Sequence, residues 1–119
     1  LKNLYKKNFI ILDARNSGRF NGRIKEPRQN LKSGHIPKSK NLFWGDLITN
    51  NGTMKRKKNL KKILKKYKLK NKNIVTSCGS GITACILSLG LLYSNNYPSS
   101  VYDGSWSEWG SIKKLPFEK

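Results

Sequence analysis

The chain is 119 residues long and holds 25 Lys or Arg against 6 Asp or Glu, a formal net charge of +19. This length fits one domain with a sizeable core. Its two cysteines are too few for a disulfide scaffold. No apolar run reaches the roughly 18 residues of a membrane-spanning helix, so we expect no membrane segment.

The positive charge has three explanations: nucleic-acid binding, attraction of anionic substrates or partners, or a compositional bias toward Lys, Asn and Ile. The lysines are scattered apart from a dense run at residues 55–72. That run does not alternate with aromatic residues, as a surface that stacks single-stranded nucleic acid would. We therefore favour bias and electrostatic steering, and expect no nucleic-acid partner.

In chain order, the first predicted element is a buried strand at residues 8–13, Asn-Phe-Ile-Ile-Leu-Asp. Residues 14–30 are polar and rich in Gly and Arg, which predicts a loop. A turn follows at 33–37 and a second short strand at 41–44. Residues 46–52 predict a helical turn that ends in Asn-Asn-Gly.

The clearest helix lies at residues 59–69, where the apolar residues form one stripe and the lysines take the solvated face. The stripe consists of Leu60, Ile63, Leu64 and Tyr67.

A buried strand at residues 74–77 leads into a helix at 83–94 that is apolar on almost all sides. Such a helix is expected to be buried against a sheet. Gly90 weakens it by about 1 kcal/mol relative to Ala, which indicates close packing at that position. A third short strand at 101–103 and an aromatic helical turn at 105–110 complete the pattern.

Strands that alternate with helices predict an α/β fold with a central, mostly parallel sheet and helices on both faces. Sites in such sheets lie beyond the carboxyl ends of the strands. Asp13, Cys78 and Asp103 all follow predicted strands at that edge, so we expect the functional site there.

Cys78 is the most informative residue, because it follows a strand and precedes Gly-Ser-Gly and a helix. Unpaired backbone N–H groups at a helix N-terminus favour thiolate over thiol. Gly79 and Gly81 let the backbone curl around the sulfur. We predict that Cys78 is an ionised nucleophile open to solvent. The alternative is a buried structural cysteine at a tight turn.

Several other kinds of site fit less well. A cysteine phosphatase needs an arginine six positions after the cysteine, where this chain has Ala84. A phosphate-binding Gly-Lys-Ser/Thr loop is missing. A metal site is not expected from two cysteines and one histidine, His35, whose Gly-His-Ile-Pro context predicts a turn-stabilising role.

Cys78 and Cys85 are expected to be free thiols. A helix between them would separate their Cα atoms by about 10 Å, beyond the roughly 7 Å that a disulfide spans. Free thiols suit a reducing compartment, so we expect a cytoplasmic protein.

Six short stretches now point to one family. They are Leu-Asp-Ala-Arg at 12–15, Gly-Arg-Phe at 18–20, Glu-Pro-Arg at 26–28, Gly-His-Ile-Pro at 34–37, Cys-Gly-Ser-Gly-Ile-Thr-Ala at 78–84 and Tyr-Asp-Gly-Ser-Trp-Ser-Glu-Trp at 102–109. Because the six stretches occur in this order and at this spacing, the chain resembles the rhodanese-like sulfurtransferases. It most closely resembles the C-terminal catalytic domain of the 3-mercaptopyruvate sulfurtransferase type.

The resemblance covers residues 9–110 and implies a rhodanese-like α/β domain. Because the chain begins at Leu1 rather than Met, we expect residues 1–119 to be a single catalytic domain, the C-terminal half of a two-domain protein. A preceding rhodanese-like domain is then an expected partner.

The resemblance also implies the site. Cys78 and Ser80 are the expected catalytic residues, and Cys78 carries the transferred sulfur as a persulfide. The expected substrate-binding residues are Arg19, Arg28, Gly79, Ser80, Gly81, Ile82 and Thr83.

The donor follows from the residues after Cys78. Thiosulfate-using members have Arg-Lys there, whereas this chain has Gly79-Ser80, which resembles the mercaptopyruvate type. Arg19 and Arg28 match the arginines that hold the carboxylate and keto oxygen of that donor, a role that suits the guanidinium fork.

The resemblance implies no metal and no organic cofactor. The implied partners are a small anionic sulfur donor and a thiol acceptor such as thioredoxin, or cyanide. Ser80 would assist proton movement with a histidine and an aspartate of the first domain. Two alternatives stay open: a thiosulfate sulfurtransferase, and a non-catalytic basic binding module.

Some other residues of the six stretches are expected to have structural roles. Asp13 and Arg15 are predicted to be structural, and Asp103, Trp106 and Trp109 to buttress the cysteine loop. Thr83 is predicted either to cap the helix or to donate a hydrogen bond into the loop.

Overall fold

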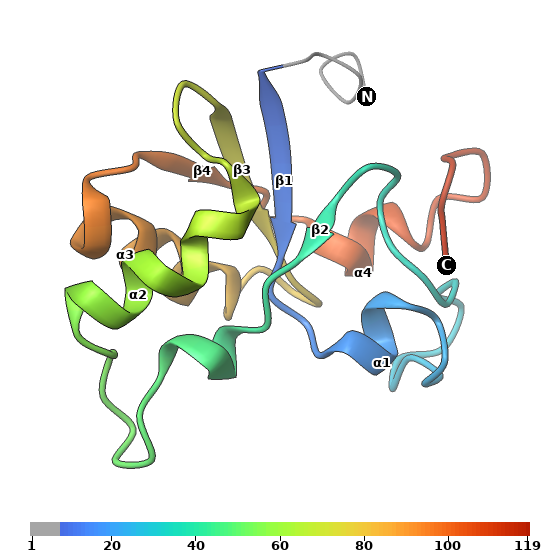
Figure 1. Cartoon of the computed structure of the whole chain (residues 1–119). Coiled ribbons are helices and arrows are strands. Elements are labelled where there is room, and N and C mark those ends of the chain that lie inside the picture. The colour runs from blue at the N-terminus through green and yellow to red at the C-terminus, as the bar shows by residue number, and fades with distance from the viewer. Residues whose placement is uncertain (1–7) are drawn as a thin grey trace.

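The computed structural model describes residues 8–119 and contains a four-stranded, all-parallel sheet in the order β2-β1-β3-β4. The strands are β1 (Phe9–Asp13), β2 (Lys40–Asn41), β3 (Asn73–Ser77) and β4 (Ser99–Val101). Figure 1 shows β1 and β3 at the centre of the sheet. The predicted parallel sheet is confirmed.

Helices cover both faces of the sheet, as predicted (Figure 1). They are α1 (Ser17–Phe20), η1 (Trp44–Leu47), α2 (Lys57–Leu64), η2 (Lys65–Tyr67), α3 (Ala84–Asn95) and α4 (Ser105–Trp109). Side chains of β1 alternate between the faces: Ile10 and Leu12 join the core beneath α2 and α3, whereas Ile11 joins Trp106 of α4.

Three predicted boundaries are corrected. The second strand occupies Lys40–Asn41 rather than 41–44, because the chain turns into η1 at Trp44. The last strand is Ser99–Val101 rather than 101–103, in register with Ile74–Thr76 of β3. The helix predicted at residues 59–69 begins earlier, at Lys57, and its last turn is the 3-10 helix η2, which ends at Tyr67.

One helix was missed within the predicted loop at residues 14–30. The single turn of α1 begins after Asn16, whose side chain accepts the Arg19 N–H at 2.9 Å. An asparagine at this position is a recognised start signal. Four residues are too few to show the apolar periodicity by which longer helices are predicted.

The predicted burial of the long apolar helix on most sides is wrong for α3. Leu87 and Leu91 are 0% exposed, but Leu89 is 59% and Leu92 52% exposed. The sheet, α2 and η1 cover only one side of α3. At 12 residues α3 is the longest helix, and no helix within residues 8–119 has the length and apolar character to cross a membrane.

The close packing expected at Gly90 is confirmed on the covered side of α3. A Cβ atom added there would lie 2.9 Å from Cδ1 of Leu47. The glycine therefore lets α3 approach η1.

Two leucines of α3 should respond differently to truncation. Leu87→Ala is expected to lower the free energy of unfolding by about 2–5 kcal/mol, because it leaves a cavity in the core. Leu89→Ala is expected to change it by less than about 0.5 kcal/mol, because the side chain is mostly in solvent. Urea unfolding measures both, and equal losses would contradict the one-sided burial of α3.

Candidate active site

The site forms at the carboxyl ends of β1 and β3, as predicted. Asp13 is the last residue of β1, and Cys78 directly follows β3. These strands are neighbours in the sheet, with Asp13 in register with Ser77. The loops that follow them therefore meet at one edge.

The sulfur of Cys78 lies inside a ring of hydrogen-bond donors. The Gly81 N–H donates to Sγ at 2.8 Å. Burial raises the pKa of Cys78, but the Thr83 hydroxyl and the N–H groups of Ala84, Gly81 and Ser80 outweigh it, and the pKa of Cys78 lies below its ordinary value. The predicted cradle of amide groups is therefore present, and its donors favour the thiolate form of Cys78.

Two residues of the loop, Thr83 and Gly81, shape the surroundings of the sulfur. Thr83 makes no side-chain cap to α3, and its hydroxyl bonds to the Cys78 sulfur instead. Gly81 has a φ of 98°, and a Cβ there would lie 2.7 Å from the backbone oxygen of Asp103. Both observations show a loop wrapped tightly around the sulfur.

The prediction that Cys78 is open to solvent is wrong for this conformation. Cys78 is 1% exposed, because its side chain turns inward to Gly81 and lies 4.0 Å from the Ser105 hydroxyl. Cys85 is exposed, and both cysteines are free thiols, as expected.

Sequence reasoning missed Ser105. This residue is fully buried, with a φ of 50° that is uncommon outside glycine. Its hydroxyl accepts the Cys78 N–H at 3.0 Å and donates to the Tyr102 carbonyl at 2.8 Å. The Asp-Gly-Ser-Trp stretch was the available signal, but only the fold brings its serine beneath the cysteine.

The first turn of α4 holds the cysteine loop from below. The Trp106 N–H donates to the Cys78 carbonyl at 2.9 Å, and the Ser107 N–H donates to the Gly79 carbonyl at 2.8 Å. The Trp106 indole is itself fixed by a bond to the Lys32 carbonyl at 2.8 Å. These contacts fit the buttressing role expected of Trp106.

A chain of alternating charges joins β1 to the site. Arg15 pairs with Asp13 at 2.7 Å and with Glu26 at 3.3 Å, and Glu26 pairs with Arg19 at 2.8 Å. The side chains of Arg15 and Glu26 are each 1% exposed. This network fits the structural role expected of Asp13 and Arg15.

Both predicted arginines and part of the cysteine loop line a hollow of about 200 Å³. It is lined by Arg19, Glu26, Pro27, Arg28, Leu31, Gly79 and Ser80. The structure thus brings together four predicted site residues, while Cys78, Gly81, Ile82 and Thr83 do not line the hollow.

Arg19 lies against the cysteine loop, because a Cβ atom added at Gly79 would lie 2.8 Å from its Nη2. The hydrogen bonds that Arg19 donates to Glu26 raise the pKa of Arg19, burial acts against this, and the charges of Glu26, Asp13 and Cys78 add smaller increases. Glu26 had no role assigned from the sequence, and here it fixes Arg19 through Nε and Nη2. Arg28 is exposed at the rim of the hollow.

His35 lies outside this site. Its Nδ1 is 2.6 Å from the Phe20 carbonyl, and its ring stacks on that of Phe20 with centroids 3.8 Å apart. These contacts fit the turn-stabilising role expected from the sequence.

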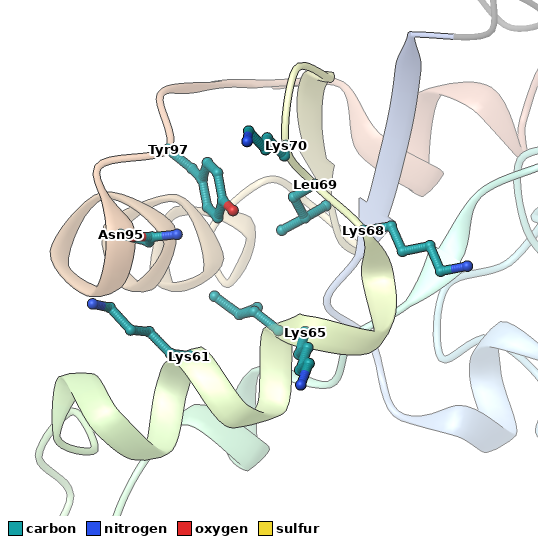
Figure 2. A pocket seen from close by; sticks show the side chains of 8 residues that line it. Lys61, Lys65, Lys68, Leu69, Lys70, Asn95 and Tyr97 are labelled. Carbon is teal, nitrogen blue, oxygen red and sulfur yellow. The ribbon is translucent and has the colours of Figure 1, made fainter.

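A second hollow, of about 280 Å³, lies between the α2–η2 segment and the end of α3 (Figure 2). Lysines surround a floor of Leu64 and Leu69, and Figure 2 shows Lys65 and Lys68 extending away from it. Its lining includes no cysteine, histidine or carboxylate. Across residues 8–119, no group of three metal-ligating side chains occurs.

The fold and the loop define a parallel α/β domain with a cysteine in an amide-lined loop between a strand and a helix. Residues 1–112 match the family model described as "Rhodanese-like domain", and the chain belongs to this family. The family and fold expected from the sequence are confirmed.

Two curated proteins illustrate the similarity in sequence. The chain is 42% identical over 110 residues to mouse 3-mercaptopyruvate sulfurtransferase, covering 92% of this chain and 37% of the relative. It is 40% identical to the Arabidopsis thaliana protein "Thiosulfate/3-mercaptopyruvate sulfurtransferase 1, mitochondrial", covering 90% and 28%.

Among solved structures, Tum1 from Saccharomyces cerevisiae superposes with a TM-score of 0.80 at 33% identity, covering 94% of this chain and 40% of Tum1. The chain thus spans about a third of the length of the curated relatives it matches.

The Thr83 hydroxyl is expected to lower the pKa of the Cys78 thiol. In a Cys85→Ser background, Thr83→Val is expected to raise the pKa of Cys78 toward its ordinary value, because the thiolate loses a donor. A lost bond to a charged group corresponds to roughly a tenfold loss of thiolate at pH 7. Thiolate absorbance against pH measures this, with Cys78→Ser as the blank. An unchanged titration would contradict a role for Thr83.

Proposed function

We propose that this protein is a sulfurtransferase that moves sulfur from 3-mercaptopyruvate through a Cys78 persulfide to a thiol acceptor or to cyanide. One observation carries the proposal: the sulfur of Cys78 sits among N–H and hydroxyl donors that lower its pKa, beside a hollow lined by two arginines. The names of the relatives support the reaction class.

In the first half-reaction, the Cys78 thiolate attacks the sulfur of 3-mercaptopyruvate. A sulfur–sulfur bond forms and the carbon–sulfur bond breaks. The electron pair of that bond passes to the carbon fragment, which leaves as pyruvate enolate and takes up the proton released from the transferred S–H group, so that pyruvate and an anionic persulfide result. The donors around Cys78 hold the negative charge left on the persulfide.

Arg19 and Arg28 orient the donor in this proposal. Glu26 engages Nε and Nη2 of Arg19. Among residues 8–119, Nη1 of Arg19 has no hydrogen-bond partner, and Nη2 has a second N–H group besides the one that Glu26 accepts, so both nitrogens can donate to a substrate oxygen. Arg28 at the rim supplies the second cation. Together they position the carboxylate and stabilise the developing enolate.

The buried sulfur must become accessible for this reaction. Rotation of the Cys78 side chain, or a small movement of the loop, would turn Sγ toward the hollow, which Gly79 and Ser80 border. The glycines at 79 and 81 permit such a movement. We propose that substrate binding between Arg19 and Ser80 stabilises the open arrangement.

In the second half-reaction, an acceptor thiolate attacks the outer sulfur of the persulfide. The sulfur–sulfur bond breaks, the acceptor leaves as a persulfide, and Cys78 returns to thiolate. A dithiol acceptor such as thioredoxin then forms its own disulfide and releases hydrosulfide. We place this chemistry in the cytoplasm, and we expect a preceding domain to add the histidine and aspartate that work with Ser80.

The burial of Cys78 favours one other candidate, a non-catalytic module with a basic surface. Such a module would not form a persulfide, so a test for the persulfide distinguishes the sulfurtransferase from the binding module.

Persulfide formation is followed by intact mass after incubation with 3-mercaptopyruvate. We expect a gain of one sulfur atom, about 32 Da, on a peptide that contains Cys78. Cys85→Ser, the matched control, should gain the same mass, whereas Cys78→Ser should gain none. No gain in the unmodified protein would refute the enzyme and favour the binding module.

The donor is tested by comparing 3-mercaptopyruvate with thiosulfate. We expect faster turnover of 3-mercaptopyruvate. Arg28→Ala should raise its KM roughly tenfold or more, because a charge-assisted hydrogen bond is lost. Arg28→Lys, which keeps the charge, should be affected less. Faster turnover of thiosulfate with no effect of Arg28→Ala would instead identify a thiosulfate sulfurtransferase.

A further inference from the structure

α3, together with Ile82 just before it, carries a row of apolar residues that are about half exposed or more. Ile82 is 76% exposed, Leu89 59%, Leu92 52% and Tyr93 48%. Cys85, also exposed, lies between them in sequence. Successive members are separated by one to four residues and fall on one side of the helix. We call these five residues the α3 stripe.

Such a face is unusual in a chain with a net charge of +19. Single exposed apolar residues are common, but a continuous row of large ones marks an interaction surface. The core does not need these side chains, because Leu87 and Leu91 supply the buried side of α3.

The α3 stripe is continuous with the proposed reaction site. It starts at Ile82, inside the cysteine loop and four residues after Cys78. A protein bound to the α3 stripe would therefore lie next to the loop that encloses the sulfur.

The surroundings of the stripe are cationic. Residues 47–102 contain no Asp or Glu, and residues 55–72 hold eleven Lys or Arg. Lys57 lies with Nζ 5.1 Å from the ring centre of Tyr93. Two copies of this surface would repel each other, whereas a partner with acidic residues around an apolar patch would be attracted.

We propose that the α3 stripe is the docking surface for the protein that brings the acceptor thiol to the Cys78 persulfide. This inference rests on the proposed function. The partner it fits carries a reactive cysteine within an apolar patch that has an acidic rim. Docking would bring that thiol to the outer sulfur, whereas a small thiol would reach the sulfur without the stripe.

The test compares two acceptors after the protein has been loaded with 3-mercaptopyruvate: 2-mercaptoethanol and reduced thioredoxin. Leu89→Glu and Leu92→Glu place a negative charge on the stripe. Phe117→Glu is the matched control, because Phe117 is 42% exposed and lies on the C-terminal segment, outside the stripe. Circular dichroism and urea unfolding check that all variants fold, and Leu89→Ala gives a milder change.

We expect normal persulfide formation and normal transfer to 2-mercaptoethanol in every variant. Transfer to thioredoxin should fall about tenfold or more in the two stripe variants, as for loss of an interface hot spot, and remain normal in Phe117→Glu. Higher salt should slow transfer to thioredoxin more than transfer to 2-mercaptoethanol.

Three results would overturn the inference: equal thioredoxin rates in all variants, an equal loss with both acceptors, or a dimer that the stripe substitutions dissociate. Absence of the persulfide in the unmodified protein would instead refute the proposed function.

Discussion

The buried guanidinium of Arg15 is the contact on which the arrangement of the site depends. It bonds to Asp13 at the end of β1, to Glu26, and to the carbonyl of Gly34, and it lies 4.9 Å from the centre of a Trp106 ring. One side chain thus joins the end of β1 to residues 26, 34 and 106. Loss of one partner from a buried ion pair typically costs about 3–5 kcal/mol, because the remaining charge is left unpaired.

The same network sets the electrostatics of the hollow. Asp13, Arg15, Glu26 and Arg19 alternate in sign, so the buried part is close to neutral. The positive charge left over at the hollow is that of Arg28, which is exposed at the rim. An anionic donor would meet that charge without leaving an unpaired cation inside the protein.

Much of this architecture follows from the sequence. The short apolar runs predict the strands, their alternation with helices predicts a parallel sheet, and glycines around a cysteine predict the cradle of amide groups. The sequence does not reveal Ser105, because its hydroxyl reaches Cys78 only after β4 and α4 are placed. It also does not reveal that α3 is covered on one side alone, since leucines facing solvent and leucines facing the core look alike in a helical pattern.

The wrongly predicted exposure of Cys78 and the wrongly predicted burial of α3 have a common physical meaning. A thiolate of low pKa is prone to oxidation in proportion to its exposure, so a sulfur that is 1% exposed is protected at rest. Chemistry then requires a binding event that opens the loop. The exposed apolar residues begin within that loop, at Ile82. A partner that covers them gains apolar burial, and this free energy is available to offset the cost of uncovering the sulfur.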